Sequence, residues 1–409
     1  MRATDDDLHD LLRDLVAIDS TNPGLVPGAA GEAALVRSLA RRLTAAGLQV
    51  DVWEPRPGRP DFVATLPGHG RDAAGAARAG GAGADADASP DGQGAPSLML
   101  VSHLDVVGAA PELFTPHVRD GRLYGRGSND MKGGLAAAVI AVERLAAEAR
   151  EAGGRSPLRG DLLLAGCADE EWESFGAEAL VARYRPTAAI LPERTDFDVT
   201  VEHGGFTWFA IESAGVEAAG AEPEKGVDAI ALLGPVLAGI AALDRELEAR
   251  PHASYGRGSI HAATIEGGTQ LPAYPGLCRL GVERCLISGE SVAQSQGEIE
   301  ALLAAARAAD PRFSASSRLV VGREPVSLRR DDPVVLALVA AAAAELGHEP
   351  RVRGDIGWAD SGIFAEAGIP CAQFGPIGGG EHTSGEWVDL ASVALVARVL
   401  EAAARRYCG

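Results

Sequence analysis

His103 and Asp105 stand at the end of an apolar run, Leu98 to Val101, and their side chains could bind or support a metal ion. Alternate residues of an extended strand face the same way, so both side chains would leave the strand on one side. A carboxylate beside an imidazole can fix the tautomer and orientation of a metal-binding histidine. A surface hydrogen bond is the simpler explanation of a lone His-x-Asp triplet, so the metal hypothesis depends on further acids and imidazoles near later strands.

Five such side chains lie just beyond apolar or glycine-rich segments. Segments that we expect to form strands end shortly before several of them, at residues 168, 191 and 374. Ligands bind at the carboxyl ends of strands in open α/β sheets, so we expect these side chains to meet at one edge of a sheet. A solvated turn and a helix cap are the alternatives for the acids. The five residues are Asp130, Glu170, Glu171, Glu193 and His382.

This set of residues favours one kind of chemistry. Two histidines and three or four carboxylates suit a pair of zinc-like ions with one bridging carboxylate. A water between such ions becomes a nucleophile near neutral pH, and an uncoordinated carboxylate can move its proton to a leaving nitrogen. The residues therefore predict metal-assisted hydrolysis. The glycine-rich stretch 125–134 is neither G-x-G-x-x-G nor a Walker sequence, which disfavours phosphate transfer.

The elements expected to position these residues alternate between strands and helices up to residue 205, which indicates a mainly parallel sheet flanked by helices. From 206 to 322 the expected order is strand-helix-strand-strand-helix-strand, the ferredoxin-like pattern. We therefore expect an α/β catalytic domain in two parts, 1–205 and 323–409, with an inserted α+β domain at 206–322. The main expected helices span 5–17, 31–47, 226–250, 290–308 and 333–346, and the main strands span 98–103, 162–168, 187–191, 259–265, 277–286 and 312–321.

Composition narrows the class of protein. The length of 409 residues favours two domains, and the segment 68–96, rich in Gly and Ala, reads as a low-complexity insertion. The net charge of −20 argues against a nucleic-acid partner, and the five cysteines show no metal or disulfide spacing. No apolar run is long enough to cross a membrane, and no signal-peptide core is present, so we expect a cytoplasmic protein with no membrane partner.

The motifs around these residues resemble those of the two-zinc metallopeptidase and deacylase family that includes acetylornithine deacetylase, succinyl-diaminopimelate desuccinylase, aminoacylase and carboxypeptidase G. The resemblance covers nearly the whole chain apart from 68–96. It rests on Ser-His-Leu-Asp-Val-Val (102–107), Gly-Arg-Gly-Ser-Asn-Asp-Met-Lys-Gly-Gly (125–134), Ala-Asp-Glu-Glu (168–171), Pro-Glu-Arg-Thr (192–195) and Glu-His-Thr (381–383).

Carried over by position, the resemblance implies two metal ions per chain that share one ligand. His103, Asp130 and Glu193 would hold one ion, and Asp130, Glu171 and His382 would hold the other. Zinc suits this nitrogen and oxygen shell, although cobalt or manganese would fit similar ligands.

The resemblance also implies roles outside the metal ligands. Asp105 would orient His103, and Glu170 would be the general base and acid. Asp360 resembles a position near the site, with a supporting or substrate-binding role. The inserted domain of the family pairs two subunits and closes over the site, so the resemblance implies a homodimer through residues 206–322.

Two positions depart from the family pattern. Ala219 stands where the inserted domain usually carries a histidine that helps to stabilise the oxyanion, and Cys285 stands where it often carries an arginine that grips a substrate carboxylate. His203 is a weak candidate to replace the histidine, and so is His261. Arg284 could replace the arginine only if the strand shifted by one residue, which would turn its side chain to the other face.

These observations predict a zinc-dependent amidohydrolase, or deacylase, that cleaves a small N-acyl amino compound through a water bridging two zinc ions. The altered inserted domain favours a specialised substrate. The alternatives are a repurposed enzyme that uses the metals for a transfer or cyclisation, and a non-catalytic metal-binding scaffold. Retention of Glu170 weighs against the scaffold, because a base that holds no metal has little structural use.

Overall fold

The computed structural model describes residues 3–70, 95–253 and 255–409. Contacts divide the chain into two compact units. The predicted inserted domain, 206–322, lies within the second unit, and most of the predicted insertion at 68–96 lies outside the described residues. The first unit comprises Met1–Val201, Leu328–Val352 and Ile363–Gly409, and the second comprises Glu202–Ser327 and Arg353–Gly362.

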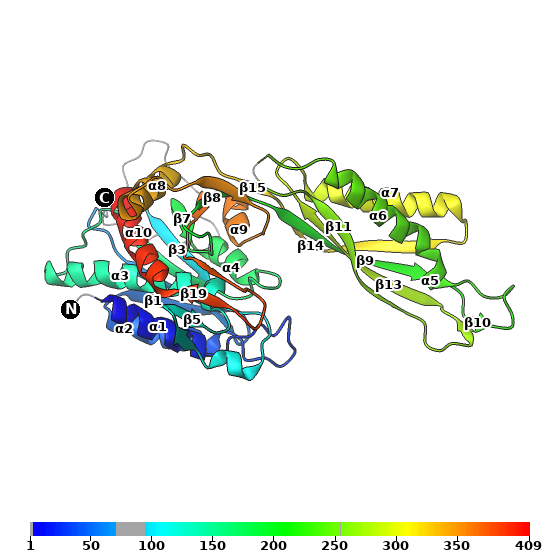
Figure 1. Cartoon of the computed structure of the whole chain (residues 1–409), viewed down its shortest axis with the longest axis horizontal. Coiled ribbons are helices and arrows are strands. Elements are labelled where there is room, and N and C mark those ends of the chain that lie inside the picture. The colour runs from blue at the N-terminus through cyan, green and yellow to red at the C-terminus, as the bar shows by residue number, and fades with distance from the viewer. Residues whose placement is uncertain (1–2, 71–94, 254) are drawn as a thin grey trace. The chain divides into compact units, whose positions relative to one another are not determined.

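A twisted sheet organises the first unit (Figure 1). Its strands, in spatial order, are β1 (Gln49–Arg56), β2 (Arg59–Leu66), β6 (Leu162–Cys167), β3 (Leu98–His103), β7 (Ala188–Leu191), β17 (Cys371–Gln373) and the start of β8 (Val199–His203). The central strands β6, β3, β7 and β17 are parallel, whereas β1, β2 and β8 pair antiparallel to their neighbours. The predicted α/β class with a mainly parallel central sheet is therefore confirmed.

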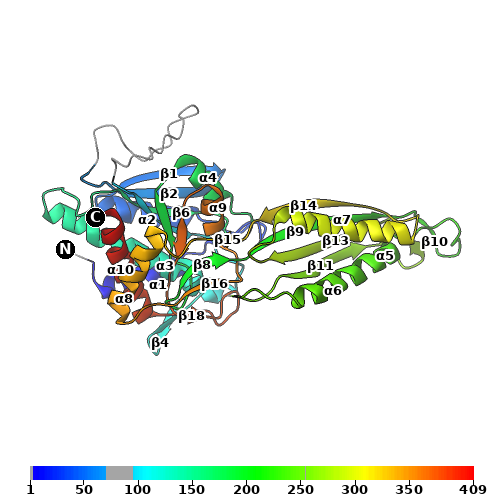
Figure 2. The same ribbon diagram turned by 90° about the horizontal axis from the view of Figure 1, so that it is seen from above.

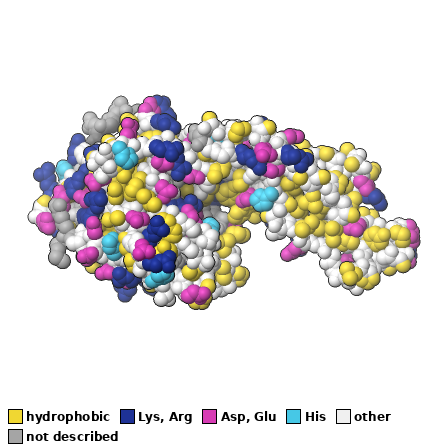
Figure 3. All heavy atoms as spheres, viewed as in Figure 1, with side chains coloured by type: hydrophobic (Ala, Val, Ile, Leu, Met, Phe, Trp, Pro, Cys, Tyr) yellow, Lys and Arg dark blue, Asp and Glu magenta, His cyan; other side chains and the backbone are white. Residues whose placement is uncertain are grey.

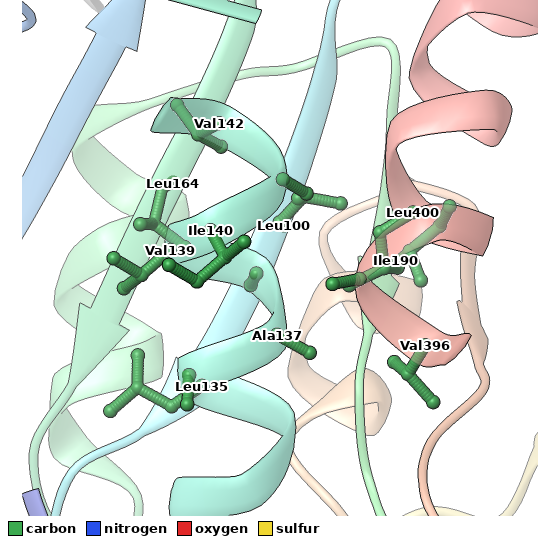
Figure 4. Packing of buried hydrophobic residues seen from close by; sticks show 14 of the residues in the cluster. Leu100, Leu135, Ala137, Val139, Ile140, Val142, Leu164, Ile190, Val396 and Leu400 are labelled. Atoms are coloured by element: carbon green, nitrogen blue, oxygen red, sulfur yellow. The ribbon is translucent and has the colours of Figure 1, made fainter. Parts of the chain in front are cut away.

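Helices cover the sheet because its strands are apolar on both faces. Leu100, Leu164 and Ile190 belong to a core between the sheet and helices α3 and α10, as Figure 4 shows. Helix α3 is buried along most of its length, which explains its run of alanines. The helices of this unit are α1 (Asp5–Ala17), α2 (Ala33–Ala45), α3 (Gly133–Glu151), α4 (Phe175–Arg183), α8 (Pro333–Leu346), α9 (Ser361–Glu366, which begins in the second unit) and α10 (Leu390–Cys408).

A second, small sheet brings two distant loops together in the first unit. Strand β5 (Arg122–Tyr124) pairs with both β4 (His117–Arg119) and β19 (Trp387–Asp389), and β19 pairs with β18 (Gly378–Gly379). The loop after β5 leads to Asp130, and the β18–β19 hairpin carries His382. This pairing places residues more than 250 positions apart in sequence next to each other.

The second unit contains a four-stranded antiparallel sheet in the order β11-β13-β9-β14. Chain order and spatial order together match the ferredoxin-like pattern expected from the sequence. The strands are β9 (Gly205–Ala214), β11 (Ser259–Gly267), β13 (Leu277–Leu286) and β14 (Ser314–Arg323), with the short β10 (Ala218–Ala219) and β12 (Ala273–Tyr274) paired beside them, while β15 (Val326–Ser327) and β16 (Val352–Asp355) pair with β8.

Helices α6 (Gly234–Glu248) and α7 (Val292–Ala309) cover one face of this sheet, as Figure 2 shows. Alternate residues of β9 and β13 are buried under them, including Phe209 and Val282. The single helix expected over 226–250 is divided into α5 (Ala229–Leu232) and α6. A proline in the first turn of α6 explains the new start, since proline lacks the N–H that a continuing helix requires.

Candidate metal centre

Parallel strands bring the predicted ligands to one edge of the sheet. His103 ends β3, Glu170 and Glu171 follow β6, and Glu193 follows β7. Because these three strands are parallel neighbours, their carboxyl ends lie together. Asp130 reaches the same place from the turn before α3.

The ligand-type atoms form two groups that share Asp130. One group is His103, Asp130 and Glu193, the other is Asp130, Glu171 and His382, and the atoms in each lie within 4.8 Å of one another. The Nε2 atom of His103 lies 3.1 Å from Oδ1 of Asp130, and the Nε2 atom of His382 lies 3.5 Å from Oδ2. Each oxygen of Asp130 therefore faces a different histidine, which is the arrangement that a bridging carboxylate requires.

A third combination brings Glu170 to the same centre. His103, Glu170 and Glu171 also lie within 4.8 Å by their ligand atoms. The Nε2 atom of His382 lies 3.2 Å from Oε2 of Glu171, so Glu171 belongs with that histidine. Glu170 is thus the acid of this cluster that is not needed to complete either of the first two groups.

The two histidines and Glu193 hold protons more strongly than they would in water. Burial lowers the pKa of His103, but its bond to Asp130 and the charges of Glu170 and Glu193 outweigh that effect and raise the pKa well above its usual value. Hydrogen bonds to Asp130 and Glu171 raise the pKa of His382 to about 10. Burial, helped by the charge of Asp130, raises the pKa of Glu193 to about 7. A bound cation would replace these protons, since metal ligands must be deprotonated.

The donor set fits zinc-like ions. Imidazole nitrogens and carboxylate oxygens are zinc donors, and each group offers three protein ligands, which leaves a position for water or substrate. Asp130 and Glu193 are buried, and Arg194 is the permanent cation that pairs with Asp130, so the charge of a divalent ion would stabilise these acids.

Asp105 supports the centre through its main chain and its side chain. Nδ1 of His103 donates to the main-chain oxygen of Asp105 at 3.0 Å, while the carboxylate lies 3.8 Å away. The same carboxylate accepts hydrogen bonds from the backbone N–H groups of Glu170 and Glu171, at 3.0 and 3.1 Å. It therefore fixes the loop that carries the two acids as well as lying beside the histidine.

Sequence reasoning missed a polar network behind this loop. The side-chain amide of Asn22 donates to Asp105 at 2.7 Å and to Asp169 at 3.1 Å. Arg59 bonds to Asp169 at 3.1 Å and, through Nε, to Glu32 at 2.6 Å. No short motif signals this network, because its members come from segments that are far apart in the chain.

Glu386 was also missed, although it holds the loop that presents Asp130. Its carboxylate accepts hydrogen bonds from the backbone N–H groups of Gly127, Asn129 and Asp130 at 2.9 to 3.1 Å, and pairs with Arg126. The side chain is only 1% exposed. A lone glutamate near a glycine-rich hairpin gives no hint of this role in the sequence.

His203 and Asp360, the two remaining candidates from the sequence, lie in the second unit. His203 is 2% exposed, and its ring nitrogens lie 2.8 Å from the main-chain oxygen of Gly204 and from the Oγ atom of Ser361. Burial lowers the pKa of His203 to about 4, so the ring is neutral, donates from Nδ1 and accepts from Ser361. Asp360 is also buried, with 1% exposure.

The positions that depart from the family pattern lie on strands of the second unit. Ala219 belongs to β10, and the half-buried Cys285 belongs to β13. Arg284 points to the other face of β13, where it is fully buried and pairs with Glu290 at 2.7 Å and Glu298 at 2.9 Å. Its guanidinium is therefore committed to the fold and does not replace an arginine at position 285.

Two further properties are the distribution of charge on the surface and the apolar length of the helices. On the face shown in Figure 3, acidic and basic side chains are interspersed. None of the helices in the described part of the chain is long and apolar enough to cross a membrane.

Comparison with known proteins identifies the family. The model of peptidase family M20/M25/M40 matches residues 99–406. Among curated proteins, the chain is 27% identical to N-formyl-4-amino-5-aminomethyl-2-methylpyrimidine deformylase of Bacillus subtilis over 369 residues, covering 83% of this chain and 80% of that protein. It is 29% identical to succinyl-diaminopimelate desuccinylase of Stenotrophomonas maltophilia, covering 71% and 78%. It is 28% identical to acetylornithine deacetylase of Myxococcus xanthus, covering 78% and 82%.

Solved structures share the fold. A tripeptidase from Staphylococcus aureus matches with a TM-score of 0.73 and 19% identity, covering 99% of both chains. A dinuclear metal-binding peptidase of the M20 family from Bacillus subtilis matches with a TM-score of 0.66 and 16% identity, covering 98% of this chain and 97% of that one. The motifs, the clustered metal ligands and the family match agree, and the chain belongs to peptidase family M20/M25/M40, as a metal-dependent hydrolase of amide bonds.

Proposed function

We propose that this protein is a two-zinc deacylase that removes an acyl group from the nitrogen of a small amino compound. The observation that carries the proposal is the pair of ligand groups sharing Asp130, with Glu170 beside them and not required by either. The relatives named above are a deformylase, a desuccinylase and a deacetylase, so each name describes removal of an acyl group. These names support deacylation over cleavage of longer peptides.

His103, Asp130 and Glu193 would hold one ion, and Asp130, Glu171 and His382 the other. When bound, two such ions polarise a carbonyl and lower the pKa of water. Cobalt or manganese would satisfy the same donors, so zinc is part of the proposal.

Glu170 is the proposed general base and acid. A carboxylate near the reacting carbonyl can take a proton from the attacking water and return it to the nitrogen of the leaving amine. The backbone of Glu170 is held by Asp105, which gives the side chain a defined starting point. Neither of the two ligand groups that share Asp130 includes Glu170, so we expect its replacement to leave the ions bound.

The second unit is the proposed dimerisation domain. Strand β11 lies at the edge of the sheet, and most of its residues are exposed, including Ile265 at 51%. An exposed apolar edge strand is a ready surface for pairing with another chain. Light scattering during size-exclusion chromatography tests this, and a monomer at all concentrations would contradict it.

The first experiment measures metal content and turnover on the same preparation. We expect two ions per chain, in line with the two ligand groups, and hydrolysis of at least one class among N-formyl, N-acetyl and N-succinyl amines. A chelator should abolish turnover and zinc should restore it. Bound metal without hydrolysis of any class would favour a scaffold or a non-hydrolytic reaction, and hydrolysis that survives metal removal would refute the mechanism.

A further inference from the structure

We propose that Arg194 binds a carboxylate group of the substrate beside the metal centre and so selects anionic N-acyl compounds. This inference rests on the proposed deacylase function and adds a specificity-determining residue to it. Neither the predicted ligand sets nor the supporting network gives Arg194 a task.

Arg194 lies beside the candidate metal centre. It directly follows the ligand Glu193, and its Nε atom lies 3.3 Å from Oδ2 of Asp130 and 3.4 Å from Oε1 of Glu381. Its side chain is 40% exposed. The Nε edge of the Arg194 guanidinium therefore contacts Asp130, the residue shared by both metal groups, while 40% of the side chain is exposed and can contact a substrate.

Other cations of the surrounding loops are already committed. Lys132 is buried and donates from Nζ to the main-chain oxygens of Leu15 and Ile18 at 3.0 and 2.8 Å. Arg126 is 3% exposed and pairs with Glu386. Among the described residues, Arg194 is the arginine or lysine that forms an ion pair with a ligand carboxylate, that of Asp130, and keeps an exposed side chain.

Charge balance within the protein is the competing explanation for Arg194. Arg59 shows what such a role looks like in this chain, because it grips Glu32 with both Nε and Nη2 and is only 13% exposed. Within the described part of the chain, the hydrogen bond and both ion pairs of Arg194 use Nε, which leaves its two Nη groups for a further acceptor. A guanidinium fork binds a carboxylate through two parallel hydrogen bonds, which matches the chemistry of a substrate carboxylate.

The second unit strengthens the case by elimination. By the resemblance described above, Cys285 stands where the family often carries an arginine that grips a carboxylate, and the neighbouring Arg284 pairs with Glu290 and Glu298. A substrate carboxylate would need another cation, and Arg194 is placed to supply it. The carboxylate could belong to the amine half, as in an N-acetyl amino acid, or to the acyl half, as in an N-succinyl amine.

The test compares matched substrates with and without the carboxylate. One pair is an N-acetyl amino acid and its carboxamide, and the other is an N-succinyl amine and its succinamide analogue. The measured quantity is the ratio of kcat/KM for the acid to kcat/KM for the neutral partner, in wild type, Arg194→Gln and Arg194→Lys. Arg329→Gln, which removes a guanidinium that is 81% exposed and pairs with Asp331, is the control.

We expect Arg194→Gln to lower this ratio by roughly 10- to 100-fold for one of the two pairs, mainly through KM, because a charge-assisted hydrogen bond is lost. Arg194→Lys should fall between, since it keeps the charge and loses the fork. The pair that responds identifies which half carries the carboxylate. An unchanged ratio in both pairs, or equal losses for acid and neutral partners, would overturn the inference.

A binding measurement separates this inference from the proposed function. In zinc-loaded Glu170→Gln protein, turnover should be blocked, so calorimetry can compare the affinity for the same acids and neutral analogues with and without Arg194→Gln. We expect a selective loss of affinity for the acid, with unchanged metal content. If wild type hydrolyses none of the substrates while Arg194→Gln still selectively loses affinity for the acid, that result would refute the proposed deacylase function and support Arg194 as a carboxylate-binding residue. If Arg194→Gln weakens neither acid selectively, the inference fails whatever the turnover.

Discussion

Two buried clusters of charge in this protein have opposite characters. In the second unit, Glu290 and Glu298 close around Arg284, whose side chain is 1% exposed, and the cluster is sealed. In the first unit, carboxylates converge with two histidines, and His382 keeps 52% of its side chain exposed. A buried ion cluster whose charges are paired has a structural role. A solvent-accessible cluster with more acids than cations is a candidate site for binding a metal ion and a substrate.

The largest expected effect tests the open cluster. Glu170→Gln should lower kcat by about 100- to 10,000-fold, because a general base and acid is lost while the shape and volume of the side chain change little. Metal content should stay the same. Steady-state kinetics and elemental analysis of one preparation measure both quantities.

Glu173→Gln is the matched control, since Glu173 belongs to the same acidic run but pairs with Arg56 at 3.0 Å and is 37% exposed. This variant should keep its activity. Loss of metal from Glu170→Gln would instead make Glu170 a ligand, and an active Glu170→Gln enzyme would refute its role.

The sealed cluster should respond in stability and not in metal binding. Arg284→Met leaves Glu290 and Glu298, whose side chains are only 12% and 15% exposed, without their cation, which should destabilise the second unit by about 3–5 kcal/mol. Thermal unfolding followed by calorimetry measures the loss. Metal content should not change.

Adding Glu290→Gln and Glu298→Gln to Arg284→Met should recover much of the stability, because the unpaired charges are then removed. A stable Arg284→Met protein would show that the cluster contributes little. Loss of metal from Arg284→Met would contradict the expectation that this cluster affects stability and not metal binding.

His203 offers a test by pH within the second unit. Burial lowers its pKa to about 4 from an ordinary 6.5, so the unfolded chain takes up the proton more readily than the folded one. The stability contribution of the neutral ring is therefore complete above pH 6.5 and is lost as the pH falls toward 4. The loss should approach about 3 kcal/mol.

Denaturant unfolding between pH 7 and pH 4 measures this dependence, and His203→Gln should make it shallower in that window. His261→Gln, which removes a side chain that is 55% exposed in the same unit, is the control. Equal slopes for wild type and His203→Gln would show that His203 does not titrate as its burial requires.

The smallest expected effect concerns the support beneath the open cluster. Asn22→Ala removes the amide that joins Asp105 to Asp169, so the loop that carries Glu170 should lose definition. We expect about a tenfold loss of kcat or of metal affinity, typical of a residue one step behind the ligands. Zinc titration and kinetics measure it, and an unaltered enzyme would show that Arg59 and the backbone suffice.

Local patterns predicted the elements well. The helices expected at 5–17 and 333–346 and the strands expected at 98–103 and 277–286 have those bounds in the structure. Apolar periodicity and capping residues are local properties, so a single sequence can report them. The expected helix over 226–250 was wrong in detail, because its apolar pattern continues across the interruption at Leu233, just before Gly234-Pro235.

Which residues could bind a metal follows from the sequence alone, because donor chemistry belongs to residue type and the strand ends that carry the donors can be recognised from apolar runs. The folded structure is needed to see that Asp130 faces both histidines, that Asn22 and Glu386 hold the loops in place, and that Arg284 is buried while Arg194 is exposed. These facts depend on which segments the sheets bring together across tens to hundreds of residues, and no local pattern encodes such distances.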